Sequence, residues 1–433
     1  MATLQIIFGG TAMTIMAKAA ALLLGTALVL GSALPHAARA GAVPAGTPAE
    51  AGLSAERLQR VTAVMQKHID AGDIAGVVTL VARHGRLAHL QAQGFADIAK
   101  RTPMRTDHIF GLASMSKPIT TVAIMMLVES GDIRLSDPVS RFIPEFAEPA
   151  MVAVPRPNGA EGTYDLVSAT RPITVGDLLK HGSGLVSGGL GARAAAQIAP
   201  RAPRDNLASY IPKLAKVPLD FQPGTLWRYS GLAGFDVLSR IVEIVSEQAF
   251  DAFLKQRLFD PLGMPDTGFH FADAARAQRV ASMHARRDGK LEVAPRELDA
   301  VYFSGAGGLA STAEDYLQFA QMLLNGGELN GRRYLGPRTV ELMRSNHTGD
   351  MVNGQFGRPA RGMGFGLGMQ VLEDPVAAAL AVSQGAYGWA GGTGVSFWIE
   401  PAEDMVAIFF IQGGAAGIAR PAFEAAVRQA IVD

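Results

Sequence analysis

A serine and a lysine that could react together stand three residues apart early in the chain. Ser114 and Lys117 lie in the run GLASMSKPIT, which covers residues 111–120. Three residues is just under one helical turn, so on a helix the two side chains share one face. A serine hydroxyl becomes a nucleophile when a neighbouring base takes its proton, and a buried lysine can be that base. This Ser-x-x-Lys, the only one in the chain, predicts acyl transfer through Ser114.

Three further stretches accompany this run in the same chain. They read ITVGDLLKHGSGL over residues 173–185, PGTLWRYS over residues 223–230 and YGWAGGTG over residues 387–394. With residues 111–120 they make the sequence resemble the serine β-lactamase and penicillin-binding-protein superfamily. Within it, the chain most resembles the family VIII carboxylesterases and their class C β-lactamase relatives. The resemblance runs from about Leu53 to the C-terminus, and four motifs in the expected order make it specific.

The resemblance implies a role for individual residues of this chain. Ser114 would be the acylated nucleophile, with Lys117 and Tyr229 as its proton-transfer partners. A lysine and a tyrosine so close together titrate as a coupled pair, and the base is not assigned to one of them alone. The backbone amides of Ser114 and Gly392 would form the oxyanion hole. The expected substrate-binding residues belong to the last motif: Tyr387, Trp389 and Gly391.

Two departures from the β-lactamase pattern bear on the substrate. Gly231 stands where that pattern has asparagine, two residues after the tyrosine, and Trp389 stands where it has the lysine that recognises a substrate carboxylate. Both changes remove polar groups that would hold a β-lactam, and tryptophan offers an apolar wall instead. We therefore expect a carboxylic ester as substrate. Class C-like β-lactamase activity and D-alanyl-D-alanine peptidase or transpeptidase activity are the alternatives.

Other function classes fit the sequence less well. An α/β-hydrolase would need a Gly-x-Ser-x-Gly elbow, which is absent. A non-catalytic binding protein would not need Ser114, Lys117 and Tyr229 together. Lysine plus arginine and aspartate plus glutamate both number 39, so no basic surplus indicates nucleic acid as a partner. No metal or other cofactor is expected, because no close cluster of histidines suggests a zinc site. We interpret His181 as a structural residue rather than a base.

The first 40 residues predict export. Lys18 precedes an apolar run from Ala19 to Leu34, and Ala38-Arg39-Ala40 fits a small-x-small cleavage site. Periplasmic location of the cleaved protein is the expectation, with secretion and a retained membrane anchor as alternatives. Met16 is an alternative start to Met1. After cleavage no stable membrane partner is expected, and the sequence gives no oligomeric state.

The arrangement of predicted elements gives the fold class. Strand patterns occur near both ends of the chain, at residues 75–93 and 366–412, with mostly helical patterns between them. We predict an α/β fold of the α+β type, similar to β-lactamases and DD-peptidases, with an antiparallel sheet flanked by helices. One domain would comprise residues 41–134 and 301–433, and a mostly helical domain residues 135–300. A loop over residues 152–171 would shape the rim of the active site.

Several helices and strands are predicted with definite bounds. The helices cover residues 54–71, 114–128, 235–259, 314–324 and 420–432. Residues 75–82 and 87–93 should form a hairpin around His84-Gly85, and the last strands should cover residues 366–372, 395–399 and 405–412.

Overall fold

The computed structural model describes residues 43–148, 150–295, 298–299, 301–352 and 361–433. The predicted export signal, residues 1–40, lies outside the described residues and stays a prediction. Among the helices of the described part, none combines the length and the apolar character needed to cross a lipid bilayer.

An antiparallel sheet built from both ends of the chain organises the fold. Within the described residues it has eight strands in the order β12-β13-β14-β15-β16-β1-β2-β3, and every neighbouring pair is antiparallel. The predicted antiparallel sheet flanked by helices is confirmed. The strands are β1 (Gly76–Arg83), β2 (Arg86–Asp97), β3 (Thr102–Pro103), β12 (Met363–Phe365), β13 (Gln370–Leu372), β14 (Tyr387–Ala390), β15 (Ser396–Glu400) and β16 (Met405–Phe410).

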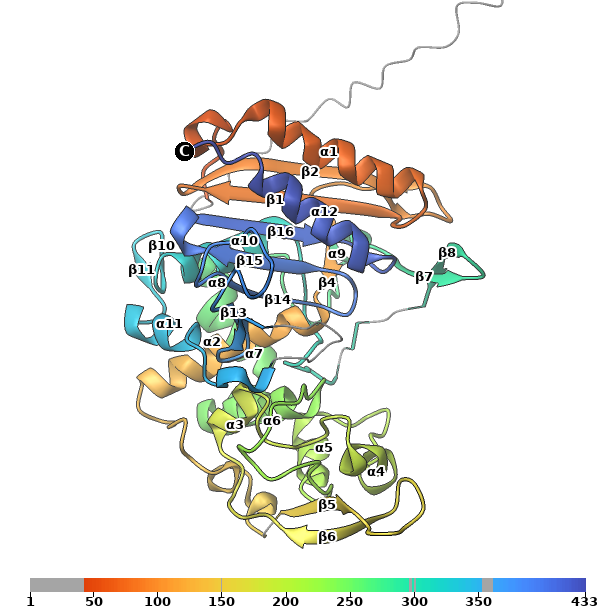
Figure 1. Ribbon diagram of the computed structural model, residues 1–433, viewed down its shortest axis with the longest axis vertical. Coiled ribbons are helices and arrows are strands. Elements are labelled where there is room, and N and C mark those ends of the chain that lie inside the picture. Colours follow the sequence, from red (N-terminus) through yellow and green to blue (C-terminus); the bar gives the residue numbers. More distant parts are fainter. Residues whose placement is uncertain (1–42, 149, 296–297, 300, 353–360) are drawn as a thin grey trace, which may run out of the picture. The chain divides into compact units, whose positions relative to one another are not determined.

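Both faces of the central strands are buried, which explains their continuous apolar sequences. In β1, Val78 and Leu80 point to one core, while Val77 and Val81 point to the other. This alternation follows from the two-residue period of a strand. Helices α1 (Ala55–Asp70) and α12 (Ala416–Arg428) lie together over one face of the sheet (Figure 1). Helices α2 (Ser116–Glu129) and α10 (Ala313–Leu324) pack in the core on the other face.

The remaining helical and strand segments complete the described part of the chain. The helices are α3 (Val175–Leu179), α4 (Leu190–Ile198), α5 (Leu207–Leu214), α6 (Ala233–Ser246), α7 (Phe250–Leu254), the π-helix η5 (Lys255–Phe259), α8 (Asp260–Leu262), α9 (Ala274–Ala277) and α11 (Pro337–Met343). Short 3₁₀ turns are η1 (Ala49–Ala51), η2 (Ala113–Met115), η3 (Val139–Arg141), η4 (Pro144–Phe146), η6 (Gly349–Val352) and η8 (Pro401–Glu403). Small two-stranded sheets pair β4 (Phe110–Gly111) with β9 (Ala310–Ser311), β5 (Met151–Pro155) with β6 (Tyr164–Ser168), β7 (Met283–Arg287) with β8 (Lys290–Ala294), and β10 (Glu328–Leu329) with β11 (Arg332–Arg333).

Predictions based on strong local signals are confirmed. Ser54 caps α1 by accepting a hydrogen bond from the backbone amide of Arg57, at 3.2 Å. The predicted hairpin forms from β1 and β2, and its turn residues His84 and Gly85 both have positive φ. The last predicted helix exists, but it covers Ala416–Arg428 rather than residues 420–432.

Two predicted elements are wrong because the chain turns inside them. The expected helix over residues 235–259 stops at Ser246, where Glu247 adopts a left-handed φ of 56° that no right-handed helix can contain. The chain restarts as α7 and the π-helix η5. The expected strand over residues 366–372 is two strands, β12 and β13, joined by a turn in which Gly368 has a φ of 72°.

The middle of the chain is less purely helical than predicted. It holds α3 to α9, but the segment expected as a loop over residues 152–171 contains the antiparallel pair β5 and β6. The hairpin β7–β8 follows before residue 300. These pairs join short segments across exposed turns, which helical and loop patterns in the sequence did not reveal. The domain boundaries near residues 134 and 300 stay a prediction.

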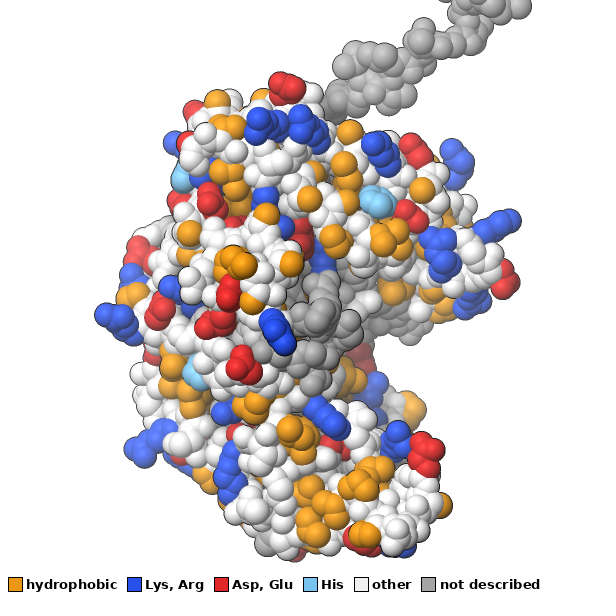
Figure 2. Space-filling model, in the orientation of Figure 1, with side chains coloured by type: hydrophobic (Ala, Val, Ile, Leu, Met, Phe, Trp, Pro, Cys, Tyr) orange, Lys and Arg blue, Asp and Glu red, His pale blue; other side chains and the backbone are white. Residues whose placement is uncertain are grey.

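Charged side chains on the face shown in Figure 2 carry both signs. Blue Lys and Arg side chains alternate with red Asp and Glu side chains over the described residues of that face, which accords with a formal net charge of zero.

Phe423 provides a test of the packing between α12 and the sheet. Its buried ring lies 5.6 Å from the Trp398 ring and 5.5 Å from the Phe409 ring, centroid to centroid. Phe423→Ala should lower the free energy of unfolding by about 3–5 kcal/mol, because it leaves a cavity. Ile418→Ala, on the same helix but 53% exposed, should change it by less than about 0.5 kcal/mol. Equal urea midpoints for the two variants would contradict this packing.

Candidate active site

Ser114 lies where a short strand turns into a helix. Strand β4 ends at Gly111, the turn η2 covers Ala113–Met115, and α2 begins at Ser116. Ala113 has a φ of 45°, an uncommon conformation for a residue with a side chain. The hydroxyl of Tyr316, on α10, donates to the carbonyl oxygen of Met115 at 3.0 Å. The backbone around Ser114 is therefore held by both the strand pair and the core.

Lys117 lies one turn further along the same face, as its spacing predicts. Its side chain is fully buried, and its Nζ lies 3.2 Å from Ser114 Oγ. The same Nζ donates to the carbonyl oxygens of Gly231, at 2.7 Å, and Ala306, at 2.8 Å. Burial lowers the pKa of Lys117 below its usual 10.5, while Tyr229 and Asp236 act in the opposite direction.

Tyr229 completes a three-residue group from two separate parts of the chain. Its hydroxyl donates to Ser114 Oγ at 2.7 Å, and its ring centroid lies 5.0 Å from Lys117 Nζ. The structure thus brings Ser114, Lys117 and Tyr229 together. The Ser114 hydroxyl therefore has an amine and a phenol within hydrogen-bonding distance, either of which could exchange a proton with it.

His181 packs behind Tyr229 and does not reach Ser114 through any hydrogen bond found in the structure. The two ring centroids are 4.5 Å apart, and the backbone amide of Ser230 donates to His181 Nδ1 at 3.2 Å. Complete burial, with a smaller contribution from Lys117, holds the pKa of His181 well below 6.5. A neutral imidazole that supports the Tyr229 ring fits the structural role expected for it.

The last motif approaches Ser114 from the sheet. Trp389, on β14, has its ring centroid 5.5 Å from that of Tyr229 and is half-buried. Gly391 comes so close to residue 112 that a Cβ there would lie 2.2 Å from the carbonyl oxygen of Leu112, whereas Gly392 is exposed with no atom near such a Cβ. Thr393 Oγ1 fixes this approach by donating to the carbonyl oxygen of Gly111 at 2.8 Å.

Tyr387 is not exposed beside Trp389 and Ser114. Only 3% of the residue is exposed, and its side chain packs from β14 into the core. Burial raises the pKa of its phenol. The expectation that Tyr387 touches substrate thus gains no support from its position, because a tyrosine at this point of the strand fills the interior instead.

Sequence reasoning missed a polar group directly behind Lys117. Asp236, on α6, is 2% exposed and accepts hydrogen bonds from Ser304 Oγ at 2.6 Å, Tyr302 OH at 2.9 Å and the Ala306 amide at 3.2 Å. The available signal was a single acidic residue in the apolar stretch LAGFDVL, residues 232–238. Buried carboxylates without partners are costly, so such a residue implies donors elsewhere in the chain.

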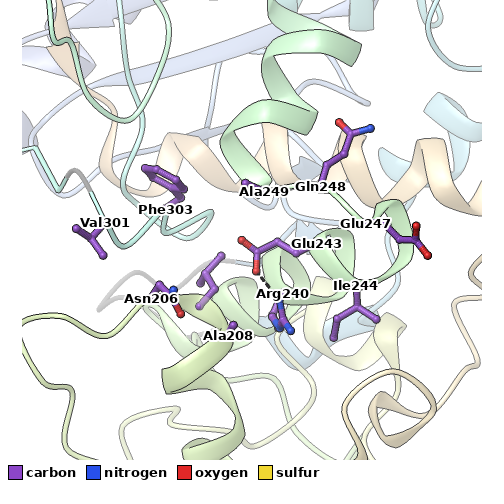
Figure 3. A pocket seen from close by; sticks show the side chains of 11 residues that line it. Asn206, Ala208, Arg240, Glu243, Ile244, Glu247, Gln248, Ala249, Val301 and Phe303 are labelled. Atoms are coloured by element: carbon purple, nitrogen blue, oxygen red, sulfur yellow. Dashed lines mark hydrogen bonds and ion pairs between the residues drawn. The ribbon is translucent and has the colours of Figure 1, made fainter.

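A hollow of about 450 Å³ lies along α6. Figure 3 shows Arg240 and Glu243 of α6 paired on one side, with Val301 and Phe303 on the other. None of its lining residues is a predicted site residue. Among the described residues, no three His, Asp or Glu side chains gather as metal ligands would.

Comparison with known proteins places this geometry in a family. The chain is 34% identical over 357 residues to Protein Rv1367c of Mycobacterium tuberculosis (strain ATCC 25618 / H37Rv), covering 79% of this chain and 87% of the relative. It is 30% identical over 390 residues to Esterase EstB of Burkholderia gladioli, covering 84% of this chain and 92% of that protein.

A solved structure agrees with these relatives. The structure of EstCE1, described as a hydrolase with promiscuous acyltransferase activity, superposes with a TM-score of 0.73 at 29% identity, over 87% of this chain and 99% of that one. The family model named Beta-lactamase matches residues 61–429. The chain therefore belongs to the beta-lactamase family, as a hydrolase of the beta-lactamase fold with esterases among its relatives.

Proposed function

We propose that this protein is a serine carboxylesterase that works through an acyl-enzyme on Ser114. The observation that carries the proposal is the contact of Ser114 Oγ with two proton-transfer groups, Tyr229 OH at 2.7 Å and Lys117 Nζ at 3.2 Å. A serine with two such neighbours has a route for its proton as it attacks a carbonyl carbon. Esterase EstB at 30% identity and the hydrolase EstCE1 at 29% identity add support from the family.

The position of Lys117 suits a neutral amine as the base. Two of its N–H bonds can point to the carbonyl oxygens of Gly231 and Ala306, which leaves the nitrogen lone pair facing Ser114 Oγ. Burial favours that uncharged form. The Ser114 proton then passes to Lys117 as Oγ bonds to the acyl carbon. Tyr229 lies where it can pass a proton on to the leaving alcohol, and the reverse transfers activate the water that releases the acid.

The oxyanion would be held by the backbone amides of Ser114 and Gly392. The close approach of Gly391 to Leu112, and the Thr393–Gly111 hydrogen bond, hold the loop after β14 beside η2. Backbone donors on such a fixed loop need no reorganisation as charge develops on the carbonyl oxygen.

An ester without a carboxylate suits the surroundings of Ser114. Trp389 and Tyr229 present neighbouring, part-exposed aromatic rings, and the buried ring of Phe365 supports Trp389 from behind at 5.2 Å between centroids. Leu226 and Leu232, which flank the Tyr229 segment, are 44% and 61% exposed. These apolar groups favour an acyl or alcohol chain over an anionic lactam.

Export to the periplasm forms part of the proposal. It rests on the apolar run and the Ala38-Arg39-Ala40 site in the first 40 residues. Small-molecule esters are the proposed partners, and the balanced charge gives no reason to add nucleic acid to them.

Removal of the nucleophile tests the reaction class. Ser114→Ala should lower the rate of p-nitrophenyl butyrate hydrolysis by at least about 10³-fold, because no acyl-enzyme can form. The thermal unfolding midpoint should stay near that of the wild type. The wild type should open a chromogenic cephalosporin slowly or not at all. A higher kcat/KM for the cephalosporin than for the ester would replace this proposal with the β-lactamase alternative.

Trp389 tests the choice of substrate. Trp389→Lys adds a cation, so activity on short-chain esters should fall at least about tenfold relative to activity on carboxylate-bearing lactams. Trp389→Phe keeps an apolar ring and should leave that ratio near the wild-type value. An unchanged ratio in Trp389→Lys would refute the role of this side chain in specificity.

Two adjacent glycines test the oxyanion hole. Gly391→Ala places a methyl group against the Leu112 carbonyl, so the loop must move away from Ser114 and kcat/KM should fall by about 10²-fold. Gly392→Ala keeps its amide and meets no atom within 4 Å, so its kcat/KM should stay within about threefold of the wild type. Similar kcat/KM values in the two variants would show that the position of this loop does not matter for catalysis.

A further inference from the structure

Asp236 is a buried carboxylate with all its described hydrogen bonds directed to one loop. Tyr302, Ser304 and Ala306 each donate to it, through a phenol, a hydroxyl and a backbone amide. Three donors on two oxygens satisfy an ionised carboxylate, which accepts but does not donate. These three donors therefore stabilise an ionised Asp236 carboxylate in the interior.

Ala306 connects this carboxylate to Lys117. Its amide donates to Asp236 Oδ1 at 3.2 Å, and its carbonyl oxygen accepts from Lys117 Nζ at 2.8 Å. Thr120, one turn beyond Lys117 on α2, donates to the neighbouring carbonyl oxygen of Gly305 at 2.8 Å. A Cβ at Gly305 would lie 2.1 Å from Ser239 Oγ on α6, so only glycine lets the loop pass between the two helices.

We propose that Asp236 is a positioning residue for acyl transfer at Ser114. Its carboxylate holds residues 302–306 so that the Ala306 carbonyl oxygen orients Lys117 Nζ toward Ser114. Its negative charge also favours the ammonium that forms when Lys117 takes the Ser114 proton. The inference rests on the proposed function, because it assigns Lys117 as the acceptor of that proton.

The electrostatic surroundings agree in direction with this role. Burial raises the pKa of Asp236, and its three donors and Lys117 act against that effect. Asp236 in turn raises the pKa of Lys117 against the larger lowering by burial. Five other titratable or charged groups lie around Asp236 and Lys117. Tyr302 and Tyr210 are on the Asp236 side, with Arg201 over the Tyr302 ring. Tyr229 and His181 are beside Lys117.

Asp236→Asn removes the charge while nearly keeping the shape. Without the carboxylate, the pKa of Lys117 falls further, so the amine stays unprotonated to a lower pH but becomes a weaker base. The acidic limb of the pH–rate profile should move to lower pH by about 0.5–1 unit, and kcat should fall about tenfold at a KM within twofold of the wild type.

The experiment follows two reactions of the full chain from pH 5 to 10. One is hydrolysis of p-nitrophenyl butyrate, which gives kcat and KM. The other is the rate of labelling by a fluorophosphonate, in which Ser114 Oγ bonds to phosphorus, fluoride leaves and the serine proton passes to the base. A wild type that is labelled at Ser114 but hydrolyses no ester would defeat the proposed function, while the labelling profile would still test Asp236.

Asp315→Asn is the matched control. Asp315 is fully buried on α10 and accepts from the Asp266 amide at 2.7 Å and the Thr267 hydroxyl at 3.0 Å, whereas the hydrogen bonds of Lys117 go to Ser114, Gly231 and Ala306. The Asp315→Asn variant should have a lower unfolding midpoint, while the acidic limb of its pH–rate profile should stay at the wild-type pH. An Asp236→Asn profile that coincides with the wild type, as a protonated Asp236 would give, overturns the proposal.

A second variant covers the case in which Asp236→Asn does not fold. Tyr302→Phe with Ser304→Ala keeps the carboxylate but removes both side-chain donors, which frees the loop and raises the pKa of Asp236. It should lower kcat about tenfold at an unchanged KM. A wild-type kcat in this double variant would overturn the proposal.

Discussion

Lys117 loses its water in this fold, and the protein must replace the hydrogen bonds that water would have made. Two backbone carbonyl oxygens do so, at Gly231 and Ala306, and they come from different parts of the chain. Isolated burial of an amine is unfavourable, so the surrounding segments are constrained to bring those oxygens to one point. The loop through Ala306 is tied in turn to α2 by Thr120 and to α6 by Asp236.

The sheet supplies the second constraint, which is the distance between the nucleophile and the loop after β14. Because β16 pairs with β1, the C-terminal strands join a sheet begun near the N-terminus. Thr393 and Gln412 both donate to the carbonyl oxygen of Gly111, at 2.8 and 3.2 Å. These contacts connect the strand that leads to Ser114 with the two C-terminal segments. A core buried on both faces of the sheet gives this arrangement the rigidity that the proposed oxyanion hole requires.

The proposed preference for esters depends on apolar surface around Ser114, Lys117 and Tyr229. Esterase EstB and the hydrolase EstCE1 are relatives of this chain, which has tryptophan and glycine where a lactam-binding site would place a cation and an amide. The part-exposed rings of Tyr229 and Trp389 lie side by side near Ser114, and the buried ring of Phe365 packs against Trp389 from the interior. In the proposed function, these rings would bind a substrate through apolar contact area, without need of a charge in the substrate.

Local signals in the sequence were enough to predict the family, the antiparallel sheet and the motif residues. Ser114 and Lys117 share a face because three residues nearly complete a helical turn, and β1 follows from its β-branched run. Elements interrupted by a residue with positive φ were predicted wrongly: Glu247 ends α6, and Gly368 divides β12 from β13.

Long-range contacts could not be predicted from the sequence either, because they depend on backbone positions. Every residue has a backbone carbonyl oxygen, so nothing in the sequence distinguishes Gly231 or Ala306 as partners of Lys117. Tyr387 and Trp389 also look alike on one strand, yet only packing decides that one is buried and the other meets Tyr229. The sequence by itself determined which groups could react, because side-chain chemistry and short spacing are local. Only the tertiary structure decided which backbone oxygens and which buried carboxylate surround them, because those contacts join residues that are at least 66 positions apart in the sequence.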